Sequence, residues 1–198
     1  MKTGVLGGTF NPPHLGHLHA AQLAKAALGL DKVLFIPTNI PPHKTLPADT
    51  ATADDRCEMV RLMICGIPWA QLDRIEIDRG GASYTVDTLR ALHARGEDNL
   101  FLIMGTDMLL CFNEMWYAAE EVAQLCTLTV CARDNEDWTL LERKAEQLRQ
   151  NMRARIELVR GDSLTISSTE LRRGGALRRY TCAAVADYIE RNHLYGCS

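Results

Sequence analysis

The sequence predicts an α/β fold in which a doubly wound, mostly parallel sheet is followed by a small C-terminal helical region. Apolar segments of strand length alternate with segments whose apolar residues recur at helical spacing, almost from one end of the chain to the other. Apolar residues make up 46% of the 198 residues and charged residues 24%, the usual mix of a globular protein. No internal repeat or linker stands out, so we expect one domain over residues 1–198, with the helical region at about 163–198.

The first strand, helix and strand are expected at residues 2–6, 17–28 and 32–37. The two outer segments are short and apolar, and the middle one places apolar residues at helical spacing. Gly29 follows the helix at the usual position for a residue beyond a helix end. A helical crossover between two strands implies that the strands are parallel and lie in one sheet.

The middle of the chain repeats this alternation. Thr52 and Asp55 have the spacing of a capping box, which predicts that a helix begins there. A strand is expected at 71–77, a helix at 85–94 and a further strand at 100–104. The last of these is continuously apolar, as a strand covered on both faces should be.

The last predicted strands lie at 125–132 and 155–159, with a polar helix at 140–152 between them. The chain then passes through Ile166 into helices that end near Asn192. In sheets of this kind, ligands bind beyond the carboxyl ends of the strands. The loops that follow the strands are therefore the places to search for chemistry.

Charge and composition exclude several classes of partner. The formal net charge is −3 and no long run of Lys or Arg occurs, so we expect no nucleic-acid partner. No apolar stretch has the length of a signal peptide or a membrane span, so we expect a cytoplasmic protein without a membrane partner. Seven cysteines without a C-x-x-C pair predict reduced thiols rather than a disulfide framework.

The loop after the first strand has the composition of a phosphate cradle. It reads GGTFNPPHLGH over residues 7–17. Gly7 and Gly8 let backbone N–H groups approach an anion, and the helix that follows offers free amides and a partial positive charge. His14 and His17 are expected to face the same site as hydrogen-bond donors to a phosphate, because phosphoryl transfer depends on positioned donors.

The same loop has two other interpretations. It could be an ordinary tight turn, and the H-x-x-H spacing could hold a metal. No Glu stands beside the histidines, and the Cys and other His residues show no partner spacing, so no protein metal site is predicted. The charge state of the histidines stays open, because a helix N-terminus opposes protonation and a bound triphosphate favours it.

Two further segments could bind phosphate. Lys44 follows Pro41, Pro42 and His43, so a lysine on a proline-stiffened loop could reach a phosphate, although an exposed lysine in a turn is equally ordinary. Residues 166–172 read ISSTELR, with hydroxyl side chains before an arginine that could bind pyrophosphate. The plain alternative for that segment is a capped helix start.

Four motifs together resemble the bacterial nicotinate-mononucleotide adenylyltransferases, a branch of the nucleotidyltransferase superfamily with a Rossmann-like fold. Residues 7–17 are similar to its (T/H)-x-G-H motif, and residues 166–172 to its I-S-S-T-x-[IL]-R motif. Residues 83–89, SYTVDTL, resemble a signature of the nicotinate branch, and GTD at 105–107 resembles G-[AST]-D. Asn11, where Asp is also common, is a minor departure, and the similarity extends to the closing pattern of Tyr188-Ile189 and Leu194-Tyr195.

The resemblance implies an enzyme that joins ATP and nicotinate mononucleotide, with Mg²⁺, to give nicotinate adenine dinucleotide and pyrophosphate in NAD biosynthesis. The catalytic residues that it implies are His14, His17, Lys44 and Arg172. The ATP-binding residues that it implies are Gly7, Gly8, Thr9, Phe10, His14, His17, Gly105, Asp107, Arg133, Ile166, Ser167, Ser168, Thr169 and Arg172. The mononucleotide-binding residues that it implies are Gly8, Thr9, Phe10, His43, Lys44, Tyr84, Thr85 and Trp116.

Three other activities share some of these features. A nucleotidyltransferase for phosphopantetheine or another small metabolite would share the first loop but would not require Tyr84, Thr85 and Trp116. An ATP-binding sensor would bind without turnover, and an aminoacyl-tRNA synthetase fragment would need an RNA-binding basic surface that the sequence lacks. The sequence does not fix the oligomeric state. A homo-oligomer is compatible with it.

Overall fold

The computed structural model of the chain describes residues 1–42, 46–47, 49–132, 138–161, 166–173 and 176–196. The chain divides into two compact units. Unit 1 comprises Met1–Leu6, Ala20–Val33 and Tyr84–Ser163. Unit 2 comprises Gly7–His19, Leu34–Ser83 and Leu164–Ser198.

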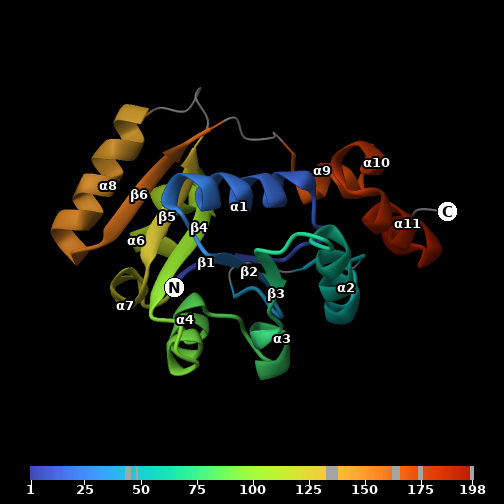
Figure 1. The fold of residues 1–198 in the computed structure, drawn as a ribbon, viewed down its shortest axis with the longest axis horizontal. Helices are drawn as coiled ribbons and strands as arrows, with labels where there is room; N and C mark the ends of the chain where they lie inside the picture. The colour runs from blue at the N-terminus through green and yellow to red at the C-terminus, as the bar shows by residue number, and fades with distance from the viewer. Residues whose placement is uncertain (43–45, 48, 133–137, 162–165, 174–175, 197–198) are drawn as a thin grey trace. The chain divides into compact units, whose positions relative to one another are not determined.

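Six strands form one sheet in the order β3-β2-β1-β4-β5-β6 (Figure 1). The strands are β1 Lys2–Gly8, β2 Lys32–Pro37, β3 Ala70–Leu72, β4 Asn99–Gly105, β5 Thr127–Ala132 and β6 Arg155–Arg160. The pairs β1·β4, β4·β5 and β5·β6 are parallel. Because β1 is central and later strands are added on both sides of it, the predicted doubly wound fold is confirmed.

Helices connect and follow the strands. They are α1 Leu15–Leu28, α2 Ala53–Met63, α3 Ile75–Arg79, α4 Thr85–Ala94, α5 Thr106–Leu110, α6 Phe112–Met115, α7 Ala119–Leu125, α8 Trp138–Met152, α9 Ser168–Arg172, α10 Leu177–Tyr180 and α11 Ala183–Arg191, with a 3₁₀ turn, η1, at Leu194–Gly196. The last three helices and the turn fall within the predicted C-terminal helical region. The division of the chain into domains stays a prediction.

The core of unit 1 is built on the central strands. All five residues from Leu100 to Met104 in β4 are buried, which is the pattern expected of a strand covered on both faces. In β5, Leu128 and Val130 are fully buried. Lys32 and Thr3 both bond the carboxylate of Glu97, which ties the loop before β4 to the start of β1.

Unit 2 is organised around α2. The predicted capping box is present, because Thr52 accepts a hydrogen bond from the amide of Asp55 and the Asp55 carboxylate accepts one from the amide of Thr52. Helix α11 packs against α2, where the thiol of Cys182 approaches the carbonyl of Leu62 at 3.9 Å. The buried residues of α11 include Val185 and Ile189, so this helix contributes an apolar face to the core of unit 2.

The predicted strand at 71–77 was wrong. Strand β3 ends at Leu72, and residues 75–79 form α3 instead. The carboxylate of Asp73 accepts a hydrogen bond from the amide of Ile75 at 2.9 Å, which starts the helical turn. Helices α5, α6 and α7, between β4 and β5, were also not predicted.

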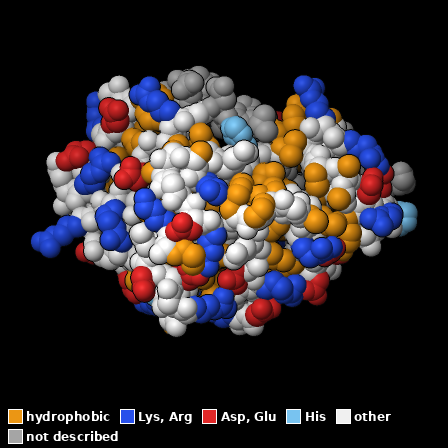
Figure 2. Space-filling view, viewed as in Figure 1, with side chains coloured by type: hydrophobic (Ala, Val, Ile, Leu, Met, Phe, Trp, Pro, Cys, Tyr) orange, Lys and Arg blue, Asp and Glu red, His pale blue; other side chains and the backbone are white. Residues whose placement is uncertain are grey.

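The surface carries mixed charge. Figure 2 shows Lys and Arg side chains interspersed with Asp and Glu side chains on the face drawn, with apolar side chains between them. None of the helices among the described residues is long and apolar enough to cross a membrane. The six cysteines in the described part of the chain are all free.

Candidate active site

The loop after β1 is folded around a buried phenylalanine. Phe10 has a left-handed backbone (φ 49°) and its side chain is 1% exposed. Its ring centre lies 4.8 Å from that of His17, and a Cβ at Gly8 would stand 3.4 Å from the ring. Position 8 therefore lies directly against the ring that contacts His17.

His14 and His17 form a stacked pair joined by a hydrogen bond. Their ring centres are 3.7 Å apart, and the backbone N–H of His14 donates to Nδ1 of His17 at 3.1 Å. Because Nδ1 of His17 accepts this bond, the ring proton of the neutral side chain must lie on Nε2. The sequence placed both histidines at one site, and the structure brings them into contact.

Burial decides the charge state that the sequence left open. Desolvation lowers the pKa of His14 to about 4. The pKa of His17 is lowered well below its usual value, first by desolvation and then by repulsion from His14. Both rings are therefore neutral at pH 7 in the free protein, and His17 offers an N–H donor rather than a positive charge.

The segment that carries α9 is bonded to this loop within unit 2. Arg172 donates to the carbonyl of Asn11 at 2.6 Å and to the hydroxyl of Thr169 at 3.4 Å. Ser168 donates to the carbonyl of Pro12 at 2.9 Å. Two motifs that lie far apart in the sequence are thus held together by direct hydrogen bonds.

Ser167 has a different task. Its hydroxyl accepts from the amide of Glu170 at 3.2 Å and donates to the Glu170 carboxylate at 2.8 Å, as the cap of α9. The capped helix start weighed as an alternative for this segment is therefore present. It coexists with a binding surface, because the neighbouring Ser168, Thr169 and Arg172 line a cavity.

This cavity lies in unit 2 and has a volume of about 290 Å³. Its lining residues are Thr9, Phe10, Asn11, His17, Leu46, Pro47, Ser168, Thr169 and Arg172. The described lining contains hydroxyl groups, an imidazole N–H and a guanidinium group, and no carboxylate. Such a donor set suits an anion with several oxygens, such as a polyphosphate.

Comparisons with known proteins identify the family. A family model described as cytidylyltransferase-like matches residues 5–174. A protein of Listeria monocytogenes serotype 4a (strain HCC23), named probable nicotinate-nucleotide adenylyltransferase, is 37% identical over 98% of this chain and 97% of its own length. A protein of the same name from Synechococcus sp. (strain JA-3-3Ab) is 39% identical over 98% of this chain and 94% of its own. The chain belongs to the nicotinate-nucleotide adenylyltransferase family.

Solved structures agree on the fold of this family. The nicotinic acid mononucleotide adenylyltransferase of Plasmodium falciparum complexed with NaAD has a TM-score of 0.76, covering 100% of this chain and 99% of its own at 16% identity. The same enzyme complexed with APC also has a TM-score of 0.76. The predicted family and the Rossmann-like fold class are confirmed.

Sequence reasoning missed Arg56, a buried residue that supports the site. Its side chain is 2% exposed and donates to the carbonyls of Thr9 at 2.8 Å and Thr38 at 2.6 Å. A third bond reaches the carbonyl of Ala51 at 3.3 Å. A signal was available, because Arg56 lies three residues before the buried Met59 and so shares the apolar face of α2.

Three of the predicted acceptor-binding residues, Tyr84, Thr85 and Trp116, lie in unit 1. Tyr84 is the N-cap residue of α4, and its side chain makes no capping bond to the first amides of this helix. The Tyr84 ring lies 4.8 Å from the exposed ring of Tyr117. Trp116 is half-buried, with its ring centre 5.1 Å from that of Phe112. Thr85 is the first residue of α4.

The remaining predicted residues fall into three groups. Gly105 and Asp107 lie in unit 1, both exposed, at the carboxyl end of β4 and in the first turn of α5. Gly7 and Ile166 belong to unit 2 and are not among the lining residues of the cavity. His43, Lys44 and Arg133 lie outside the described residues.

Proposed function

We propose that this chain transfers the adenylyl group of ATP to nicotinate mononucleotide, giving nicotinate adenine dinucleotide and pyrophosphate, and that the cavity in unit 2 holds the triphosphate. Membership of the nicotinate-nucleotide adenylyltransferase family supports the activity. The observation that carries the assignment of the cavity is that His17 and Arg172, from two separate sequence motifs, line the same hollow.

The reaction needs positioned donors more than covalent chemistry. A phosphate oxygen of the mononucleotide attacks the α-phosphorus of ATP, and the bond from that phosphorus to the oxygen bridging to the β-phosphorus breaks. The electron pair of that bond leaves with pyrophosphate. The attacking phosphate is already ionised at neutral pH, so no protein base is required.

The cavity residues have complementary roles in this scheme. His17 donates from Nε2 to a phosphoryl oxygen as negative charge develops, without the cost of moving a proton. Arg172 offers two N–H groups to the leaving pyrophosphate, since guanidinium groups pair well with phosphate oxygens. His14 acts behind His17, because its backbone N–H fixes the tautomer of that ring. Lys44 as a further phosphate contact stays a prediction.

Other predicted residues are assigned to the nucleoside parts of the substrates. Tyr84 and Thr85 stand at an N-terminal helix end whose amides and dipole favour a carboxylate, which suits the nicotinate group. Trp116 would stack on the pyridine ring. Gly105 and Asp107 are proposed to bind the adenosine ribose, with Arg133 near the adenine or the phosphates.

We expect Mg²⁺ to bind together with the triphosphate of ATP. Among the described residues, no group of three His, Cys, Asp or Glu side chains could hold a metal ion. The donors of the cavity fit phosphate oxygens, and Mg²⁺ often binds through substrate phosphates while keeping its waters. When bound, the ion would neutralise charge on the triphosphate. We further propose that the protein acts in the cytoplasm without nucleic-acid or membrane partners, and that copies of the chain can form a homo-oligomer.

An acceptor panel tests the function. Purified protein with magnesium and ATP should release pyrophosphate with nicotinate mononucleotide, less with nicotinamide mononucleotide, and none with phosphopantetheine. Turnover with phosphopantetheine instead would replace the proposed acceptor. Binding of ATP without turnover on any acceptor would make the protein a sensor.

A further inference from the structure

We propose that Tyr195, in the C-terminal 3₁₀ turn, is a positioning residue that holds the first loop in its active conformation through Asn11. The Tyr195 hydroxyl donates to Oδ1 of Asn11 at 2.7 Å, across 184 positions of sequence and within unit 2. The proposal rests on the proposed function, because it concerns the loop assigned to the triphosphate. It also gives a task to the closing Leu194-Tyr195 pattern.

Asn11 is a junction of hydrogen bonds. Its side-chain oxygen also accepts from the amide of Ala51 at 3.1 Å, and its Nδ2 donates to the hydroxyl of Thr50 at 3.2 Å. Its own carbonyl accepts from Arg172 at 2.6 Å. The residue is 3% exposed and its backbone stands between Phe10 and His14. A shift of Asn11 would therefore move both His17 and the seat of Arg172.

The backbone at Tyr195 is held in an unusual conformation. Its φ of 59° and ψ of 26° fall in the left-handed region, which residues with side chains rarely adopt. Such conformations persist where the surrounding structure determines them, and they cluster at functional positions. In this conformation the side chain of Tyr195 is half-buried and its hydroxyl bonds to Asn11.

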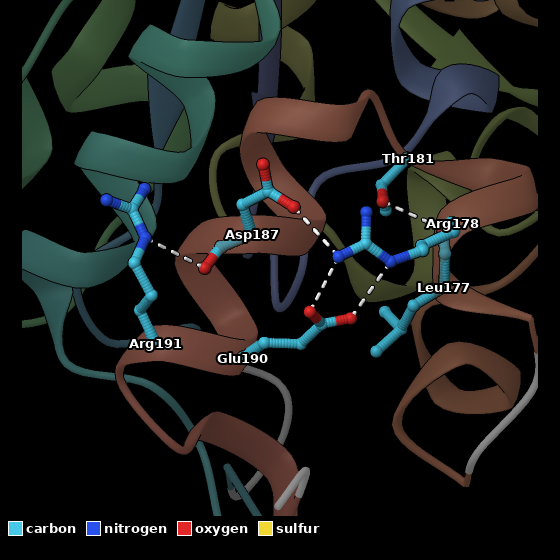
Figure 3. Close-up of polar contacts among 6 residues, drawn as sticks. All are labelled: Leu177, Arg178, Thr181, Asp187, Glu190 and Arg191. Atoms are coloured by element: carbon cyan, nitrogen blue, oxygen red, sulfur yellow. Dashed lines mark hydrogen bonds and ion pairs between the residues drawn. The ribbon is translucent and has the colours of Figure 1, made fainter.

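The helices before Tyr195 are braced among themselves. Figure 3 shows the Arg178 guanidinium between the carboxylates of Asp187 and Glu190, at 2.8 Å and 2.6 Å. Arg191 donates to the carbonyl of Asp187 at 3.1 Å. These bonds join α10 to α11 and α11 to itself. The turn that carries Tyr195 therefore follows two helices that are bonded to each other.

Tyr188 provides a matched comparison in the same region. Its hydroxyl donates to the Asp55 carboxylate at 2.8 Å, at the capped start of α2. Tyr188→Phe and Tyr195→Phe each remove one hydroxyl and one hydrogen bond between the C-terminal helical region and the rest of unit 2. Only the bond of Tyr195 ends on the first loop, so only its loss should disturb the phosphate site.

The two variants are compared by steady-state kinetics, thermal unfolding and hydrogen exchange of the amides in residues 8–17. Tyr195→Phe should lower kcat by about tenfold and raise KM for ATP by about threefold, which is the range expected for one hydrogen bond. Exchange at residues 8–17 should become faster. Tyr188→Phe should shift the melting temperature by a similar amount and leave kcat and the exchange of this loop unchanged.

Combining Tyr195→Phe with Asn11→Ala tests the route. If Tyr195 acts through Asn11, the double variant should have the same kcat as Asn11→Ala alone. Equal kcat for the two tyrosine variants, with unchanged loop exchange in both, would overturn the proposal. If the unmodified protein shows no transfer to nicotinate mononucleotide, the proposed function fails, and loop exchange still decides the role of Tyr195.

Discussion

The backbone N–H of His14 donates to Nδ1 of His17 at 3.1 Å, and this bond fixes which nitrogen of His17 can meet a substrate. The proton of the neutral ring lies on Nε2. Because burial keeps the pKa of His17 well below neutral pH, the ring acts as a preset donor and does not have to release or take up a proton.

Replacement of His17 should reduce turnover according to what is left of this donor. His17→Ala should lower kcat by about 10²- to 10³-fold, the usual loss of one preorganised donor, with a smaller change in ATP affinity. His17→Gln, whose amide N–H can reach the place of Nε2, should retain more activity than His17→Asn. Pyrophosphate release and ATP titration measure the two effects. Unchanged kcat in His17→Ala would remove His17 from the mechanism.

The buried His14 should make stability depend on pH. Its pKa is about 4 in the fold, against 6.5 in the unfolded chain, so below pH 6.5 the unfolded state binds a proton that the folded state does not. The contribution of His14 to the free energy of unfolding should fall by roughly 3 kcal/mol as the pH drops from 6.5 to 4. Urea titrations at several pH values check this.

His14→Gln is the control for that experiment. It should remove the His14 part of the pH dependence and leave the part due to His17. Identical pH profiles for the two proteins would show that His14 is protonated as easily in the fold as outside it.

Arg56 should matter for stability more than an exposed arginine of the same helix. Arg56→Met would leave the carbonyls of Thr9 and Thr38, which are partly buried, without their charged donor, at a cost of about 3 kcal/mol in the free energy of unfolding. Arg61→Met, in the exposed ion pair with Glu58, should change it very little. Chemical denaturation compares them, and equal effects would contradict the assigned support of the first loop.

Trp116 should affect one substrate only. Trp116→Ala should raise KM for nicotinate mononucleotide by about tenfold, a loss that matches one aromatic stacking contact, and leave KM for ATP unchanged. Trp116→Phe should restore most of the difference. A parallel rise in both KM values would show that the residue supports the fold instead of the pyridine ring.

The sequence predicted the parts of this molecule that depend on local pattern. The capping box at Thr52 and the bounds of α4 are as predicted, because both depend on neighbours a few residues away. The prediction of a strand at 71–77 was wrong because the side chain of Asp73 starts a helix. A hydrogen bond of this kind does not show in the spacing of apolar residues.

The site residues also divide into those that a local motif predicts and those that depend on distant partners. Motifs predicted that His17 and Arg172 serve one ligand, and the structure places both on one cavity. Arg56 and Tyr195 escaped prediction because their partners are backbone or side-chain oxygens far away in the sequence. The hydroxyl of Ser167, which was predicted to bind phosphate, caps α9.

The cavity that His17 and Arg172 line should hold the triphosphate of ATP, with Arg172 on the part that leaves as pyrophosphate. Calorimetric titration of inorganic pyrophosphate and of AMP, each with magnesium, into the unmodified protein and Arg172→Ala tests it most directly. Arg172→Ala should weaken pyrophosphate binding by about tenfold or more, the value of one charge-assisted bond, and leave AMP binding unchanged. Equal loss for both ligands, or no loss for pyrophosphate, would contradict it.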